Sequence, residues 1–171
     1  FYAFDYHPDA GSNYFLAGAQ DNGTQQFNSP GFGPTVFASR GDGAYCNIDK
    51  VDPNNQFSQY VFNNYYRSTD GGANFEAVTV PGTISGTGRF INPSDYDGVS
   101  KTLYAAANYG DFMRWKNATT STSFDLVKVT GMQGQVSAVT VSATTPDKIY
   151  LGTDFGEVME VTNASTVSAP A

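Results

Sequence analysis

The sequence predicts an all-β protein, and three observations support that fold class. Aromatic residues make up 15% of the 171 residues and charged residues only 15%, a balance that suits short, half-buried strands. Eighteen glycines and eight prolines supply the tight turns that such strands need. No long segment places its apolar side chains at the helical period of 3.6 residues. We therefore expect almost no helix.

Short apolar segments recur along the chain at a nearly constant interval. Aligned on Leu16, Tyr60, Tyr104 and Tyr150, they are separated by 44, 44 and 46 residues (60 − 16, 104 − 60 and 150 − 104). Each follows a turn rich in proline, Asp or Asn, and each turn follows another alternating segment, which predicts a hairpin. The apolar segments are 14–18, 59–63, 102–106 and 148–152, and the strands expected before the turns are 2–6, 45–49, 88–91 and 136–141.

A third strand is expected after the apolar segment, as at 64–68 and 111–115, and a fourth in places, as at 75–80 and 124–129. A unit of about 44 residues with up to four antiparallel strands is typical of one propeller blade. The predicted fold is therefore a β-propeller segment of about four antiparallel blades, forming part of a larger ring. The expected blades cover about 1–39, 40–82, 83–131 and 132–165, followed by a linker or disordered tail at 166–171.

An incomplete ring would leave sheet faces exposed, so we expect the remaining blades in the parent protein or in another chain. A compact domain of four units is the alternative. The net charge of −7 and the pI of about 4.4 argue against nucleic acid as a partner. No apolar run is long enough to span a membrane. The single cysteine, Cys46, cannot form a disulfide within the chain and is expected to be buried.

The most specific motif is the stretch 68–75, Ser-Thr-Asp-Gly-Gly-Ala-Asn-Phe. The carboxylate of Asp70 can accept backbone N–H groups across a tight turn. Gly71 and Gly72 can adopt the positive φ that such a turn requires. Ser68 begins the motif, and Phe75 returns an aromatic ring to the blade.

This stretch resembles the Asp-box, or BNR-like repeat, Ser/Thr-x-Asp-x-Gly-x-Thr-Trp/Phe, with Asn74 in place of the usual threonine. Together with segments 18–24 and 41–44, it is similar to sortilin-type propellers of bacterial surface proteins and to xyloglucanase-type glycoside hydrolases. The resemblance covers about residues 1–165 and implies a propeller in a secreted or cell-surface protein. It does not fix the activity, because such repeats occur in sialidases, glucanases, sorting receptors and adhesins.

Two carboxylates are candidates for glycoside hydrolysis, which needs a pair of acids facing each other across a cleft. Asp21 and Asp154 follow the apolar strands of the first and fourth units, and Asp154 lies in a Thr-Asp-x-Gly turn like one that carries a catalytic aspartate in the xyloglucanase-type family. Both occupy equivalent turns, where aspartates are ordinarily structural. The second and third units carry 63–64 (Asn-Asn) and 108–109 (Asn-Tyr) there, which are not acids.

Four aromatic residues near turns are candidates for ligand binding, because flat rings stack on sugars or anchor a protein. They are Tyr65, Tyr66, Tyr109 and Trp115, and packing between blades is the alternative. No cofactor is expected. Calcium could be held by the acids at 42, 49 and 52, although these can equally be solvated turn residues.

The sequence thus favours a non-catalytic propeller segment of a secreted or cell-surface protein that binds a glycan or a protein, or serves as a scaffold. The alternative is part of a xyloglucanase-type glycoside hydrolase that uses aspartates at the propeller face.

Overall fold

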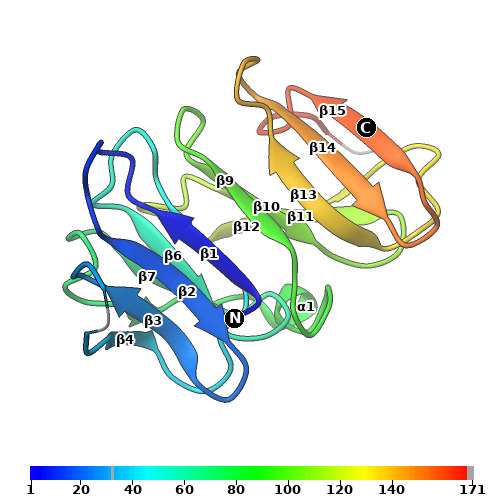
Figure 1. The fold of residues 1–171 in the computed structure, drawn as a ribbon. Helices are drawn as coiled ribbons and strands as arrows, with labels where there is room; N and C mark the ends of the chain where they lie inside the picture. Colours follow the sequence, from blue (N-terminus) through cyan, green and yellow to red (C-terminus); the bar gives the residue numbers. More distant parts are fainter. Residues whose placement is uncertain (32, 169–171) are drawn as a thin grey trace.

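The computed structural model describes residues 1–31 and 33–168, and its strands form four antiparallel sheets. The sheets stand side by side in an arc, as four blades of a propeller (Figure 1). The predicted all-β fold is confirmed. Within the described residues the only helix is α1 (Gly82–Ser85), a single turn in the connection between the second and third sheets. No described helix is long and apolar enough to cross a membrane.

Each sheet follows the order of its strands in the chain. The first sheet contains β1 (Ala3–Tyr6), β2 (Phe15–Ala19), β3 (Gly23–Phe27) and β4 (Val36–Ser39). The second contains β5 (Cys46–Ile48), β6 (Gln56–Gln59), β7 (Tyr65–Ser68) and β8 (Glu76–Ala77). The third contains β9 (Ser94–Asp97), β10 (Thr102–Ala106), β11 (Asp111–Lys116) and β12 (Ser123–Lys128), and the fourth contains β13 (Val136–Val141), β14 (Lys148–Thr153) and β15 (Val158–Thr162).

The first strands of successive sheets are neighbours and are tied by carboxylates. Asp5 Oδ2 accepts the amide of Ile48 at 2.6 Å, and Asp95 Oδ2 accepts the amide of Val141 at 2.7 Å. Both bonds join one blade to the next at equivalent positions. Burial raises the pKa of Asp95 above its ordinary value.

Two arginines make a second repeated link, on the third strands. Arg67 Nη1 donates to the carbonyl of Ala118 at 2.9 Å, and Arg114 Nη1 donates to the carbonyl of Ala164 at 2.9 Å. In each case the acceptor lies in the loop after the third strand of the following sheet. The sequence repeat is thus also a repeat of contacts between blades.

The hydrophobic core lies between the sheets. One cluster joins the first and second sheets and contains Cys46, which is 4% exposed, so its predicted burial is confirmed. A second cluster joins the second and third sheets around Trp115, and a third joins the third and fourth sheets around Tyr104. Each blade therefore depends on its neighbour for most of its apolar burial, since a single sheet has no closed core of its own.

Two strand predictions were wrong. Residues 88–91 form a loop, and the third sheet begins instead at Ser94, inside the predicted turn. Gly88 has a positive φ of 87°, and Asn92 Oδ1 accepts the amide of Arg89, which closes a local turn in place of a strand. The segment 59–63 is likewise mostly a turn, because β6 ends at Gln59 and Phe62 has a φ of 53°.

Candidate functional site

The turns between second and third strands and the connections between sheets all lie on one face of the propeller arc, at the same end of the strands in every blade. We call this face the crossover face; it lies at the lower side of Figure 1, with α1. The turn after β2 carries Asp21, and the turn after β14 carries Asp154. The structure therefore places both predicted acids on this face, on the first and fourth blades.

Asp21 is exposed at the tip of its turn, with a φ of 61°. Its amide donates to Asp42 Oδ1 at 2.9 Å, which joins this turn to the connection between the first and second sheets. The two backbones approach so closely that a Cβ at Gly18 would lie 1.9 Å from the carbonyl oxygen of Ala44. The two glycine-rich motifs of the sequence thus form one packed backbone unit.

Asp154 is held by protein donors on both oxygens. Its Oδ2 lies 2.9 Å from Arg89 Nη2, and its Oδ1 accepts the amide of Gln135 at 2.8 Å. Arg89 also donates through Nε to the carbonyl of Val136 at 2.7 Å. Asp154 therefore ties the fourth blade to the connection that precedes the third. Each oxygen of this partly exposed carboxylate thus accepts a hydrogen bond from the protein.

A buried polar network lies behind the crossover face. Asn63 and Asn92 are fully buried, and Asn92 Nδ2 donates to Asn63 Oδ1 at 2.9 Å and to the carbonyl of Ala106 at 3.0 Å. Asn63 Oδ1 also accepts the hydroxyl of Tyr65 at 2.8 Å. Burial raises the pKa of Tyr65 well above its usual range. This network fixes the loops of the second and third blades, and the sequence indicated only that asparagine replaces an acid at position 63.

Aromatic side chains form a strip along this face. Phe62 and Phe90 pack edge to face with ring centroids 6.0 Å apart, and Tyr109 and Phe155 do so at 6.5 Å. Arg89 precedes Phe90 and pairs with Asp154, which precedes Phe155, so the two aromatic pairs lie on loops that this ion pair connects. We call Phe62, Phe90, Tyr109 and Phe155 the aromatic strip. Tyr109 is 63% exposed, Phe155 65% and Phe90 46%.

Two of the four aromatic residues predicted to bind a ligand are core residues. Trp115 is fully buried and packs against Tyr65, with ring centroids 5.7 Å apart. Tyr65 is 3% exposed. Both show the alternative, packing between blades, because their strand positions point between the second and third sheets. Tyr109 belongs to the aromatic strip, and Tyr66 lines a separate groove.

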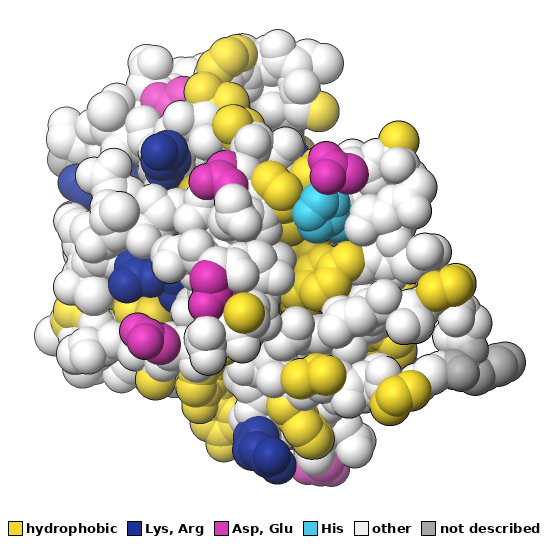
Figure 2. All heavy atoms as spheres, turned by 90° about the vertical axis from the view of Figure 1, so that its left-hand side faces the viewer, with side chains coloured by type: hydrophobic (Ala, Val, Ile, Leu, Met, Phe, Trp, Pro, Cys, Tyr) yellow, Lys and Arg dark blue, Asp and Glu magenta, His cyan; other side chains and the backbone are white. Residues whose placement is uncertain are grey.

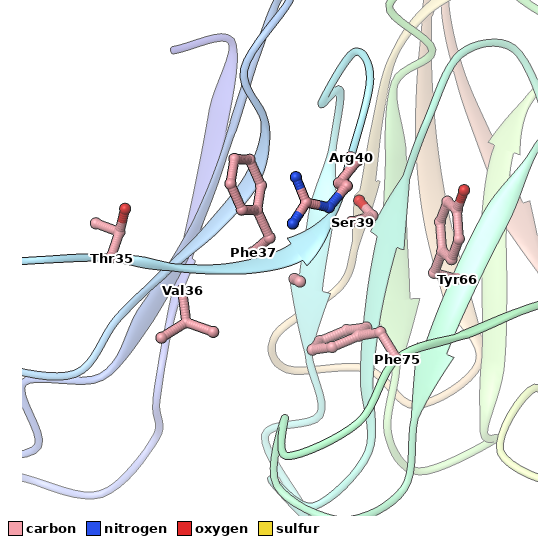
Figure 3. Close-up of a pocket in the computed structure, with 8 residues that line it drawn as sticks. Thr35, Val36, Phe37, Ser39, Arg40, Tyr66 and Phe75 are labelled. Carbon is pink, nitrogen blue, oxygen red and sulfur yellow. The ribbon is translucent and has the colours of Figure 1, made fainter.

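That groove has a volume of about 550 Å³ and lies between β4 and the second sheet (Figure 3). Phe37 and Arg40 border it on the side of the first sheet, and Tyr66 and Phe75 on the side of the second. The guanidinium of Arg40 lies 4.6 Å from the centroid of the Phe37 ring. Phe75 also packs against the core between these sheets, so the last residue of the motif serves blade packing.

The turn after β7 is built around Ser68 and Asp70. Asp70 Oδ1 accepts the hydroxyl of Ser68 at 2.7 Å and the amide of Asn74 at 3.0 Å, and Asp70 Oδ2 accepts Asn74 Nδ2 at 2.8 Å. Gly71 and Gly72 have φ values of 71° and 87°. The hydrogen bonds from the Asn74 side chain and backbone and from Ser68 lower the pKa of Asp70 to about 2.

We predict that Asp70→Asn lowers the melting temperature at pH 7 and that the difference from the unmodified chain closes in acid. The folded pKa of about 2 lies below the ordinary value of 3.8, so the ionised carboxylate adds stability above about pH 4. This stability is lost as the pH falls through 2. Thermal unfolding from pH 7 to pH 2 checks it, with exposed Asp9→Asn as the control. A difference in melting temperature between Asp70→Asn and the unmodified chain that persists unchanged at pH 2 would contradict the stabilising role of the Asp70 carboxylate.

The acids considered for calcium do not form one cluster. Asp42 precedes β5, whereas Asp49 and Asp52 follow it at the opposite end of the blade. Asp49 Oδ1 accepts the amides of Val51 and Asp52, as a turn residue does. Over residues 1–31 and 33–168, no three His, Cys, Asp or Glu side chains gather in a way that could hold a metal ion.

Comparisons with solved structures show the same fold. A GH74 enzyme of Niastella koreensis has a TM-score of 0.66 at 17% identity, over 96% of this chain and 28% of that one. An ancestral GH74 enzyme has a TM-score of 0.66 at 14% identity, over 98% of this chain and 24% of that one. YCF48 from Cyanidioschyzon merolae has a TM-score of 0.55 at 12% identity, over 96% of this chain and 68% of that one.

At these identities the likeness shows the propeller fold alone. The chain spans about a quarter of the length of the two GH74 enzymes. No protein family model matches the sequence. No curated protein matches it either.

Proposed function

We propose that this chain is a non-catalytic, glycan-binding segment of a larger propeller, and that the aromatic strip is its binding surface. One observation carries the proposal: two pairs of aromatic side chains lie on the loops of the crossover face, and three of the four rings are 46–65% exposed. Exposed rings on loops that also carry polar side chains suit the apolar faces and the hydroxyls of sugar rings. The motifs that resemble xyloglucanase-type propellers make xyloglucan the polysaccharide to test first.

A binding role is favoured over hydrolysis by the placement of the two acids. Asp154 accepts hydrogen bonds from Arg89 and Gln135, and Asp21 lies on the first blade whereas Asp154 lies on the fourth. A glycosidase needs two carboxylates with room for the scissile bond and, in inverting enzymes, a water between them. We infer that both aspartates are structural. We also infer a secreted or cell-surface location, in keeping with a polysaccharide ligand and with the resemblance to surface propellers.

Binding is tested by affinity electrophoresis in gels that contain soluble xyloglucan. We expect retardation of the unmodified chain, and we expect Tyr109→Ala and Phe155→Ala each to weaken binding about three- to tenfold, since a ring contact contributes about 1 kcal/mol. Tyr6→Ala removes an aromatic ring that is equally exposed (62%) but lies at the far end of β1 from the crossover face, so it should bind normally. Equal retardation of all four proteins would place the ligand elsewhere.

The hydrolase alternative is tested with the same polysaccharide. We expect no release of reducing sugar by the unmodified chain. Turnover that disappears in Asp21→Ala or Asp154→Ala would overturn the non-catalytic assignment.

The proposal also makes the four sheets one arc of a larger ring. We infer that the remaining blades are supplied by the protein to which the chain belongs or by another chain.

A further inference from the structure

The first sheet exposes large apolar side chains on the face turned away from the second sheet. Phe1 is 77% exposed, Phe4 70% and Tyr6 62%. Figure 2 looks at the molecule from this side and shows hydrophobic side chains gathered beside the single histidine, His7. Exposed apolar patches of this kind on a soluble protein mark surfaces that bind another surface.

This face is also hollowed. A groove of about 730 Å³ is lined by Phe4, Tyr6, Phe15 and Phe27, among others. The rings of Phe15 and Phe27 stack with centroids 4.3 Å apart, and Phe1 meets Phe27 edge to face at 5.9 Å. The aromatic side chains therefore form one continuous apolar surface. We call it the leading face of the first sheet.

Strand register identifies the counterpart of this face in the other blades. In the first sheet, Tyr6 pairs with Phe15, which pairs with Phe27, so the three side chains form one row on the leading face. Tyr6 lies on the first strand of its sheet. The residues at the same position on the first strands of the second, third and fourth sheets are Ile48, Tyr96 and Val141. The corresponding rows are Ile48–Gln56–Ser68, Tyr96–Leu103–Trp115–Phe124 and Val141–Ile149–Val161.

In every later blade this row is covered by the preceding blade. Ile48 packs in a cluster with Leu16 and Ala38 of the first sheet. Trp115 packs against Phe57 of the second sheet, with ring centroids 5.4 Å apart. The row of the fourth sheet lies in one cluster with Tyr104 of the third. The leading face of the first sheet is thus the one such face with no sheet upon it among the described residues.

A second copy of this chain is a poor fit for this face. The free face of the fourth sheet is the surface that would have to cover it, and its row is Thr140–Tyr150–Glu160. Glu160 stands where the third sheet has Arg114, and it is paired with Lys148 at 2.9 Å. Packing this ion pair onto aromatic rings would remove two charges from water without new partners, which is costly.

We propose that the leading face of the first sheet is covered by another antiparallel blade of the same polypeptide, which packs on it as each blade here packs on its predecessor. This inference rests on the proposed larger ring, and it names the surface through which this chain contacts the rest of that ring. The covering blade presents an apolar face, like the face of the second sheet that carries Phe57 and Tyr65 or the face of the third sheet that carries Tyr104 and Phe112. A single polypeptide is favoured because the matched GH74 chains extend well beyond the part they share with this one, 28% and 24% of their length.

Hydroxyl-radical footprinting tests the proposal on two samples, the 171-residue chain and the natural protein that carries this sequence. We expect labelling of Phe4 and Tyr6 to be about fivefold lower in the natural protein, because packing in a blade interface removes most of their solvent exposure. Labelling of Tyr109 and Phe155 should be equal in both samples. Glycan binding is measured separately, so a failure of one proposal does not imply a failure of the other.

Two outcomes would overturn the proposal. Equal labelling of Phe4 and Tyr6 in both samples would show an uncovered face. Protection in the 171-residue chain that disappears on dilution, with a dimer mass by light scattering, would identify a second copy as the occupant.

A variant gives the same test through stability. Tyr6→Ser should lower the melting temperature of the natural protein and leave that of the 171-residue chain nearly unchanged. Val99→Ser removes a side chain that is equally exposed in a turn (70%) and should be neutral in both. An unchanged melting temperature for Tyr6→Ser in the natural protein would contradict the proposal that another blade packs on this face.

Discussion

Trp115→Ala is expected to destabilise the protein by about 3–5 kcal/mol, the usual range for removing a large aromatic residue from a core. The side chain is fully buried between the second and third sheets. Its ring stacks on Phe124 with centroids 4.9 Å apart and meets Phe57 and Tyr65 at 5.4 and 5.7 Å. Its Nε1–H donates to the carbonyl of Ser121 at 2.9 Å, so the substitution also removes a hydrogen bond, although Arg67 Nη1 still donates to that carbonyl at 3.1 Å.

Equilibrium unfolding in urea, followed by circular dichroism, measures this loss. Tyr109→Ala is the matched control, because it removes a ring that is 63% exposed and should change stability by less than about 0.5 kcal/mol. A loss below about 1 kcal/mol for Trp115→Ala would mean that Trp115 is not packed between two blades.

Arg114→Ala is expected to destabilise the protein by about 2–4 kcal/mol, because a buried charged donor is removed from two carbonyl acceptors. Arg114 is 5% exposed and donates through Nη1 to Ala164 at 2.9 Å and to Val167 at 2.8 Å. It also pairs with Asp125 at 3.0 Å. Both carbonyls lie in the segment that follows β15, the last strand of the fourth sheet, so we expect the fourth blade to loosen first.

Hydrogen exchange of β14 and β15 measures this loosening, alongside urea unfolding for the total. Arg40→Ala is the control, because the guanidinium of Arg40 contacts only the ring of the exposed Phe37 among the interactions found in the described residues. Arg114→Lys should recover only part of the stability, since an ammonium group cannot reproduce the planar fork. Unchanged exchange in β14 and β15 would refute the link between blades.

The fold could be predicted because its signal is periodic. Leu103 and Tyr104 in β10, and Ile149 in β14, lie in apolar segments that recur at the predicted interval, and the structure keeps these strands. The same rule failed at residues 88–91, where a positive φ at Gly88 and the side chain of Asn92 favour a turn. Proline and asparagine mark a bend, but only the hydrogen bonds decide on which side of it the strand begins.

Part of the candidate site could be predicted in the same way. Asp21 and Asp154 were placed on one face because equivalent turns of a propeller lie at the same end. The partner of Asp154 could not be predicted, since Arg89 is 65 residues away and reaches it across a blade boundary. The sequence did not indicate a role for Phe155, because its contact with Tyr109 depends on the relative orientation of turns in two neighbouring blades.

The exposure of aromatic residues was the least predictable feature. Tyr65 and Tyr66 are neighbours in β7, yet Tyr65 enters the core between the second and third sheets and Tyr66 faces the groove beside the first. Successive side chains of a strand point to opposite faces, so a register shift of one residue would exchange their roles. The sequence shows that side chains alternate between the two faces. Because both faces of a blade can be covered by neighbouring blades, the sequence does not show which face is left exposed.

The most direct test of the glycan-binding proposal is a crystal structure of the chain with a xyloglucan oligosaccharide. We expect sugar rings against Tyr109 and Phe155, with hydroxyls near the Arg89–Asp154 pair. An oligosaccharide bound instead in the groove between Phe37 and Tyr66, with the aromatic strip bare, would contradict it.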